Sequence, residues 1–154
     1  MAFTSAALAE GKIGFVNSQK ILNDAPQAAR AKKKIEKDFE KRDQELQKLA
    51  KQLQSLQENM DKNAVTMAES ERRNKEREFA DLNRDFQRKQ REFREDLSQR
   101  QNEEMASIFE RVNKVIKQIA ESEKYDIIFQ EAVYANPRID ITDKVIKALG
   151  DGTK

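Results

Sequence analysis

Histidine, cysteine and tryptophan are missing from this chain of 154 residues, which also has only 4 glycines and 2 prolines. Without histidine or cysteine there can be no Ser/His/Asp triad, no thiolate nucleophile, no His or Cys ligand for zinc and no disulfide framework. Charged residues make up 38% of the chain and hydrophobic residues 37%. This composition is not that of a membrane-spanning or disulfide-rich protein, and it leaves either a disordered chain or a long helical rod with a small core.

Catalytic and cofactor motifs are also missing. The Gly11-Lys12 pair lacks the earlier glycine and the Ser/Thr of a phosphate-binding loop. The acidic pairs Glu103/Glu104 and Asp140/Asp143 are better explained by helix-surface and capping chemistry than by metal binding or acid/base work. The net charge of +2 is too small for a typical nucleic-acid-binding domain. We therefore expect no enzyme, no cofactor, no metal and no nucleic-acid partner.

The middle of the chain has the composition of long helix. From residue 27 to residue 136 there are 110 consecutive residues without glycine or proline. Apolar residues recur there at alternating steps of three and four, a spacing that a disordered chain would not maintain and that is typical of a coiled coil. The repeat is carried by Ile35, Phe39, Leu46, Leu49, Leu53, Leu56, Met60 and Met67, by Phe79, Leu82, Phe86 and Phe93, and then by Leu97, Met105, Ile108, Val112, Val115 and Ile119.

A single helix of this length is improbable for a small protein, so the span is expected to reverse. The apolar repeat thins near residues 61–74, and Thr66 with Glu69 has the spacing of a capping box, which marks a helix start. We predict an antiparallel helical hairpin over 26–122 with its tip near 62–69. The first arm, from Pro26 to Lys62, would be roughly 55 Å long.

The two ends of the chain have a different residue pattern from that of the arms. Residues 12–16 and 125–129 are short apolar runs of strand type, and 133–135 is a third. A final helix is predicted after Asn136-Pro137, with Thr142 as its cap and Gly150 as its stop. The fold class is therefore mainly α with a small β body, in which residues 10–25 and 123–154 form one α+β unit at the base of the hairpin.

Three strands of about four residues cannot bury enough apolar area to balance the roughly 1 to 2 kcal/mol of backbone entropy per ordered residue. Their open edges would also be free to pair with other chains. We therefore expect self-association, in which strands from several copies close a shared sheet or barrel. The residues expected in this oligomeric body are Ile13, Phe15, Ile127, Phe129, Val133 and Tyr134.

Residues 1–9 have two readings. Ala7-Leu8-Ala9 fits the small-x-small rule of a signal-peptide cleavage site, but the stretch lacks a basic region and is short for a complete signal. It is either the remnant of a secretory signal or a scar of cloning. Elsewhere no apolar run approaches the about 20 residues of a membrane-spanning helix.

The arrangement resembles the Skp/OmpH family of periplasmic chaperones for outer-membrane proteins. Three features carry the resemblance: the opening strand KIGFVNSQKIL before a proline-marked helix start, the charged hairpin, and the closing segment YDIIFQEAVYANPRIDITDKVIKAL. The closing segment is the most specific of the three. The hairpin alone would be weak support, because many coiled coils look like it.

The resemblance implies a homotrimer whose small bodies form a common β-barrel, with three helical hairpins around a cavity that holds unfolded outer-membrane proteins without ATP. It also implies a periplasmic location and leaves open a transient contact with anionic lipid or lipopolysaccharide. The chain departs from the best-known members, which are clearly basic, in its nearly balanced charge. It also lacks a glycine at the tip.

Two sets of residues on the arms are candidates for contact with a client. Phe79, Phe86 and Phe93 are not among them, since their spacing of seven is better explained by packing against the first arm. Near the tip, methionine offers an adaptable surface, and on the second arm the stretch from residue 84 to residue 94 has five basic and two acidic residues. The candidates are Met60, Val65 and Met67 near the tip, and Arg84, Arg88, Lys89, Arg91 and Arg94 on the second arm.

Other function classes remain open at this point. A cytosolic prefoldin-like chaperone has a similar plan of hairpin and barrel. A nucleic-acid-binding coiled coil would need its basic faces to act together, and a structural tether between envelope layers would need a fixed protein partner. Our leading hypothesis is an ATP-independent holdase that shields apolar segments of unfolded proteins.

Overall fold

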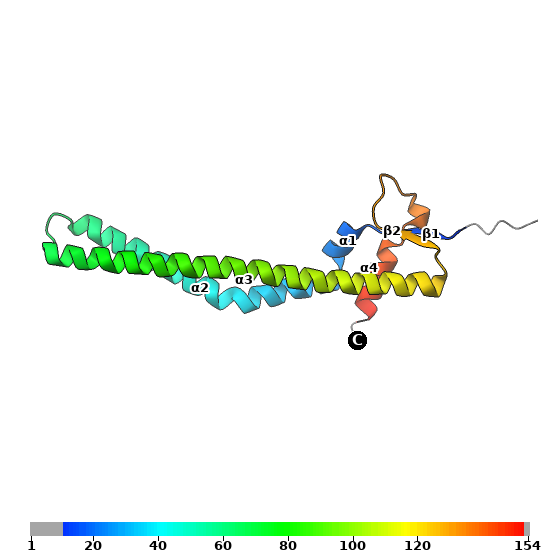
Figure 1. Cartoon of the computed structure of the whole chain (residues 1–154), viewed down its shortest axis with the longest axis horizontal. Helices are drawn as coiled ribbons and strands as arrows, with labels where there is room; N and C mark the ends of the chain where they lie inside the picture. Colours follow the sequence, from blue (N-terminus) through cyan, green and yellow to red (C-terminus); the bar gives the residue numbers. More distant parts are fainter. Residues whose placement is uncertain (1–10, 153–154) are drawn as a thin grey trace, which may run out of the picture. The chain divides into compact units, whose positions relative to one another are not determined.

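A computed structural model describes residues 11–152 of the chain (Figure 1). The elements follow in the order β1 (Ile13–Phe15), α1 (Ser18–Asp24), α2 (Pro26–Asn63), α3 (Glu69–Glu123), β2 (Ile127–Phe129), a short 3-10 turn (Pro137–Ile139) and α4 (Thr142–Asp151). The prediction of a mainly helical chain with a small β component is confirmed. Residues 1–9, with their predicted signal or cloning remnant, lie outside the described residues.

The chain forms two compact units. The first unit is Met1–Lys32 together with Glu104–Lys154, and the second is Lys33–Glu103. Among the described residues, the first unit therefore combines β1, α1, β2 and α4 with the first turns of α2 and the last turns of α3. The second contains most of α2, the turn after it and the first part of α3.

The second unit is an antiparallel helix pair. The rings of Phe39 and Phe93 meet edge to face, with their centroids 5.5 Å apart. Arg42 donates to Asp96 at 2.7 Å, and the ammonium of Lys89 lies 3.7 Å from the Glu45 carboxylate. Phe39 meets Phe93, whereas residues 48–59 farther along α2 line a groove with residues 75–82 of α3, as expected when the chain turns back on itself. The predicted packing role of Phe93 fits this geometry.

The core of the first unit is apolar and continuous. Apolar residues of α3 that are three or four positions apart form one stripe on the helix, because residues with this spacing share a helix face. This stripe faces α1, α4 and the start of α2. Eleven buried side chains make up this cluster: Val16, Ile21, Ala25, Ala31, Ile108, Val112, Ile116, Ile119, Ile141, Val145 and Leu149. The cluster explains why the apolar enrichment near the end of α3 is wider than a two-helix contact requires.

The sheet of the first unit has only two described strands. β1 and β2 are parallel and pair Ile13 with Ile127, Gly14 with Ile128 and Phe15 with Phe129. The pairing continues where Val16 N donates to Phe129 O at 2.9 Å, and a bridge links Phe15 to Asp140. The sheet brings residues more than 110 positions apart into register, so it ties the two ends of the chain together.

The prediction of a third strand at 133–135 is wrong for the described chain. These residues have no strand conformation, and the side chains of Val133 and Tyr134 are exposed. A strand forms only where a neighbouring strand supplies hydrogen-bond partners. Within residues 11–152 the edge of β1 next to this region is used by Asp140 and Ile141, whose N–H donates to Phe15 O at 2.8 Å.

The predicted boundaries of the last helix also need correction. Thr142 is the first residue of α4 instead of its cap, and the capping position, Ile141, makes no side-chain cap bond. The Thr142 hydroxyl accepts a hydrogen bond from Asn17 N at 2.9 Å, while Asp140 Oδ1 accepts from Thr142 N at 2.8 Å. The hydroxyl thus ties α4 to the segment before α1. Gly150 lies inside α4, which continues to Asp151 because Gly150 keeps a helical conformation.

At the tip, the predicted capping box is wrong as well. α2 ends at Asn63 and α3 begins at Glu69. Thr66 N donates to Asn63 O at 3.1 Å, and its hydroxyl donates to the same carbonyl at 3.4 Å. Thr66 therefore satisfies a free carbonyl at the end of α2 instead of an amide at the start of α3, because the turn brings it closer to the helix it leaves.

Candidate functional site

The described residues show neither a cluster of metal-ligating side chains nor a membrane-spanning helix. Among residues 11–152, no three His, Cys, Asp or Glu side chains come together as a potential metal site. None of the described helices is both long and apolar enough to span a bilayer. The features that invite a functional reading are instead surfaces: an apolar sheet face, the hairpin turn, the charges of the helix pair, and two grooves.

One face of the small sheet is a block of four large apolar side chains. Ile13 and Ile127 are paired across the strands, as are Phe15 and Phe129, so all four point to the same side. Ile13 is 44% exposed, Ile127 and Phe129 are each 46% exposed, and Phe15 is half-buried. Four of the six predicted body residues are thus brought together on one uncovered face.

The other two predicted body residues lie apart from that block in the chain. Val133 and Tyr134 are on the loop between β2 and the 3-10 turn, and both side chains are largely open to solvent. Together with the sheet face, they add to the exposed apolar surface of the first unit. Exposed apolar patches on soluble proteins commonly mark interaction sites.

At the turn of the hairpin, the three predicted contact residues differ. Val65 is 98% exposed, whereas Met60 and Met67 are half-buried. The methionines continue the apolar repeat of the two helices, as their register indicated. Only the valine therefore presents its whole side chain to a partner.

The basic cluster predicted on α3 is largely neutralised by its neighbours. Arg84 pairs with Asp81, Arg88 with Asp85 and Glu92, and Lys89 with Asp85 and Glu45. Hydrogen bonds from its guanidinium to Asp85 and Glu92 raise the pKa of Arg88 above its ordinary value. Arg91 and Arg94 are exposed and have no ion pair within the described part of the chain.

Sequence reasoning missed a second set of cations, on α2. The five lysines between residues 37 and 62 are all exposed, and none forms an ion pair among the residues that the structure describes. They are Lys37, Lys41, Lys48, Lys51 and Lys62. A helical projection could have found them, because their spacings of four, seven, three and eleven all return to one side of a helix.

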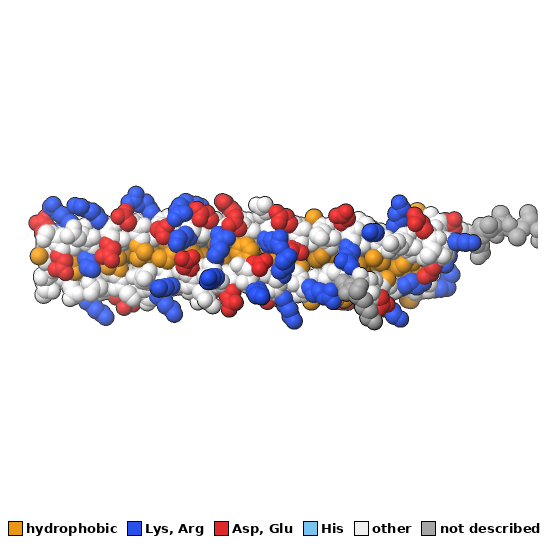
Figure 2. All heavy atoms as spheres, turned by 90° about the horizontal axis from the view of Figure 1, so that it is seen from below, with side chains coloured by type: hydrophobic (Ala, Val, Ile, Leu, Met, Phe, Trp, Pro, Cys, Tyr) orange, Lys and Arg blue, Asp and Glu red, His pale blue; other side chains and the backbone are white. Residues whose placement is uncertain are grey.

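An elongated groove lies between the helices of the second unit. From α2 it is lined by Lys48, Lys51, Gln52, Ser55, Leu56 and Asn59, and from α3 by Lys75, Glu78, Asp81 and Leu82. Leu56 is buried and Leu82 half-buried, so the floor is apolar while the rims are polar. On one face of the molecule, Figure 2 shows hydrophobic side chains in a broken line flanked by charged ones.

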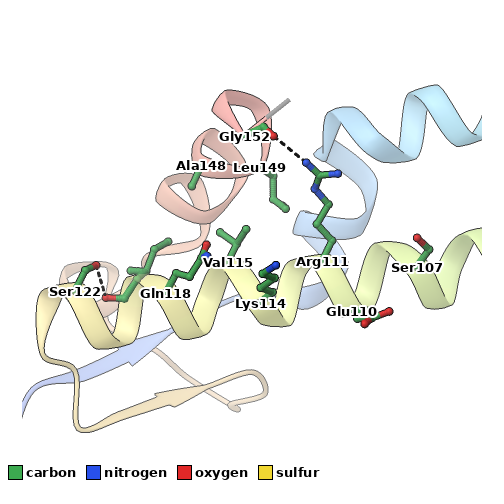
Figure 3. A pocket seen from close by; sticks show the side chains of 11 residues that line it. Ser107, Glu110, Arg111, Lys114, Val115, Gln118, Ser122, Ala148, Leu149 and Gly152 are labelled. Carbon is green, nitrogen blue, oxygen red and sulfur yellow. Dashed lines mark hydrogen bonds between the residues drawn. The ribbon is translucent and has the colours of Figure 1, made fainter. Parts of the chain in front are cut away.

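A second groove lies in the first unit, between α3 and α4 (Figure 3). Val115 and Leu149 line it together with several polar side chains of α3. The guanidinium of Arg111 crosses it and donates to Gly152 O at 3.0 Å. Arg111, the one arginine that lines this groove, therefore holds the end of α4. The groove is part of the internal packing of the first unit.

Ion pairs link the end of α3 to α4 and to the residue before β1. Lys144 donates to the two carboxylate oxygens of Glu123 at 2.8 and 2.6 Å, and Lys12 Nζ lies 3.8 Å from the same carboxylate. The hydrogen bond from Lys144 lowers the pKa of Glu123, and the same bond raises the pKa of Lys144. Lys12 also stacks 4.2 Å from the centre of the Tyr125 ring.

Comparison with known proteins places this geometry in a family. A family model described as "Outer membrane protein (OmpH-like)" matches residues 12–149. The "Chaperone protein Skp" of Photorhabdus luminescens is 33% identical over 97% of this chain and 92% of its own length. The "Chaperone protein Skp" of Pectobacterium atrosepticum is 31% identical with the same coverage.

The fold is also that of a solved relative. The crystal structure of an OmpH-like outer membrane chaperone from Caulobacter crescentus superimposes with a TM-score of 0.80, covering 100% of this chain and 93% of that one at 18% identity. The match to the family model covers nearly the whole described region, including both ends that build the first unit. The chain therefore belongs to the OmpH-like outer membrane protein family.

Proposed function

We propose that this protein is a periplasmic chaperone that binds unfolded outer-membrane proteins and prevents their aggregation without ATP. The observation that carries the proposal is the family match over residues 12–149, together with relatives named as Skp chaperones at about 30% identity. The chemistry of the chain agrees with it: exposed apolar and charged surfaces offer many weak contacts, and no phosphate-binding motif is present in the sequence.

The proposal includes self-association into a homotrimer through the small sheet. Two three-residue strands are marginal by themselves, and the face formed by Ile13, Phe15, Ile127 and Phe129 is uncovered in the single chain. Strands from further copies would cover that face and pair the free edges. The client would then be held between the helix pairs of the assembled copies.

An aggregation assay tests the chaperone activity directly. A urea-unfolded outer-membrane β-barrel protein is diluted into buffer with a stoichiometric excess of this protein and no nucleotide, and light scattering is followed. We expect scattering to stay low, and Mg-ATP to make no difference. Aggregation at the rate of the client alone would refute the holdase function, whereas suppression only with ATP would refute its independence of nucleotide.

A further inference from the structure

The lysines of α2 form a stripe with no acidic residue in it. At about 100° per residue, the five lysines between residues 37 and 62 fall within an arc of about 80° on the helix, and every acid of α2 lies outside that arc. We call this set the lysine stripe: Lys37, Lys41, Lys48, Lys51 and Lys62. The charge of α2 is therefore asymmetric although the whole chain is nearly neutral.

Two members of the lysine stripe reach the groove between α2 and α3. Lys48 and Lys51 line its α2 rim. The acids on the opposite rim do not compensate them, because Glu78 is paired with Lys75 at 3.4 Å and Asp81 with Arg84. Beneath these charges lies the apolar floor of Leu56 and Leu82. The groove thus combines an apolar floor with two uncompensated cations on one rim.

The length of the groove suits an extended peptide. From residue 48 to residue 59 the α2 rim is about 16 Å long, at 1.5 Å per helical residue. An extended chain covers that length with about five residues. Its side chains alternate between two faces, so apolar residues at every second position could rest on the floor while the intervening acidic residues meet the lysines. Strands of outer-membrane barrels alternate apolar and polar residues with this period.

We propose that the groove between α2 and α3, with Lys48 and Lys51 of the lysine stripe on its rim, is the docking surface for extended client segments in which apolar and acidic residues alternate. The proposal rests on the chaperone function proposed above and assigns client contact to α2, not to the basic cluster of α3. The apolar floor favours a protein segment over a nucleic acid, whose phosphates would use the lysines and leave the leucines uncovered.

Site-specific photo-crosslinking tests the location. A benzoylphenylalanine replaces Gln52, which lines the groove, or Gln54, a glutamine on the same helix turned about 200° away from it. Each full-length variant is mixed with a urea-unfolded outer-membrane barrel protein and irradiated. We expect crosslinks to the client from position 52 and at least fivefold fewer from position 54. Equal yields would overturn the docking surface, even if both variants still suppress aggregation.

Charge reversal tests the chemistry. The probe is a fluorescent 11-residue peptide of alternating valine and aspartate, and a matched peptide carries lysine in place of aspartate. K48E/K51E removes the two cations of the groove, whereas R91E/R94E makes the same change of charge on α3 outside the groove. We expect K48E/K51E to weaken binding of the acidic peptide about tenfold, and R91E/R94E to weaken it less than threefold.

The outcomes separate this proposal from the general function. An equal or larger loss in R91E/R94E, or equal affinity of the wild-type protein for both peptides, would overturn the groove while leaving the holdase intact. Failure of the wild-type protein to protect the full-length client would instead refute the chaperone function on which the groove proposal rests. Binding of a DNA duplex or of anionic vesicles that depends on Lys48 and Lys51, without binding of the acidic peptide, would also overturn the proposal.

Discussion

At the residue scale, Gly14 shows how little space the inner face of the sheet offers. A Cβ at this position would lie 3.1 Å from the Tyr125 ring and 3.2 Å from the Ile128 side chain. Both neighbours are partly buried against the core of the first unit. The sequence marks Gly14 only as an interruption of a short apolar run, so its packing role could not be predicted before Tyr125 and Ile128 were placed beside it.

Replacement of Gly14 by alanine should therefore destabilise the protein. We expect G14A to lower the free energy of unfolding by roughly 1 kcal/mol, because the ring and the isoleucine must move to admit the methyl group. Urea unfolding measures the change. G150A is the control: its Cβ would meet Pro26 at an ordinary 3.7 Å inside α4, so alanine there should leave stability unchanged or raise it. Destabilisation of both variants alike would contradict the packing argument.

Glu123 offers a prediction on pH. Its pKa is lowered by the bond from Lys144, so its contribution to stability is present above the ordinary glutamate pKa of about 4.3 and is lost as the pH falls through the lowered value. Because the pKa of Lys144 is raised, the contribution of this ion pair is fully present below the ordinary lysine pKa of about 10.4 and is lost as the pH rises through the raised value. We expect E123Q to be less stable than wild type at pH 7, and the difference to shrink below about pH 4.

Urea midpoints of wild type and E123Q measured from pH 3 to pH 7 check this expectation. The matched control is E121Q, which removes a neighbouring carboxylate of α3 whose lysine partner lies 4.0 Å away on the same helix face. Its stability difference from wild type should stay small and nearly constant with pH. If E123Q and E121Q gave the same pH profile, the network around Glu123 would not be responsible.

At the scale of elements, α4 is held by a buried hydroxyl. Thr142 is 2% exposed, and its hydroxyl accepts from Asn17 N, so the first turn of α4 is hydrogen-bonded to the segment between β1 and α1. Sequence reasoning placed a helix here correctly, and its Val145 and Leu149 side chains are buried. It assigned Thr142 to capping because the distant partner, Asn17, is visible only after the chain ends have met.

T142V tests this tie between elements. Valine keeps the shape of the side chain but leaves the part-buried Asn17 N–H without its acceptor, which should cost about 1 kcal/mol. Hydrogen exchange of the Asn17 amide and urea unfolding report the loss. T142S retains the hydroxyl and should recover most of the amide protection. A protected Asn17 amide in T142V would show that another group replaces the hydroxyl.

The helix pair illustrates which charge arguments work from sequence. The four-residue spacing of Glu69/Arg73 and of Asp85/Lys89 places both partners one turn apart on one helix, and both ion pairs form. Arg42 has the same spacing from Asp38 but bonds Asp96 of the other helix. Local spacing decides the first kind of pair, whereas the second depends on which side chains the antiparallel packing brings opposite each other.

At the scale of the whole molecule, the apolar sheet face predicts the behaviour of the assembled protein. If further copies cover that face, a charge placed in its middle should prevent assembly, because a carboxylate buried without a partner is very costly. We expect native mass measurement to find three chains per particle for wild type and a single chain for F129D. V65D, at the exposed hairpin turn, should leave the particle at three.

The measurement separates assembly from folding. Circular dichroism of F129D should remain strongly helical, since α2 and α3 in the second unit do not contain this residue. A trimer in F129D would show that the sheet face is not the interface, and any wild-type count other than three would contradict the proposed trimer. Loss of helix together with assembly would show that the first unit does not fold as a single copy.

The sequence by itself determined the two long helices, the direction change between them and the apolar stripe that ends in the first unit. These features follow from local rules: the absence of glycine and proline and the heptad spacing act within a few residues of each position. Tertiary structure alone decided that residues 133–135 form no strand in the described chain, that the Thr142 hydroxyl accepts from Asn17 N, and that Arg42 bonds Asp96 of the other helix. Each of these depends on groups far apart in the chain approaching to hydrogen-bond distance, which a spacing of residues along the sequence does not specify.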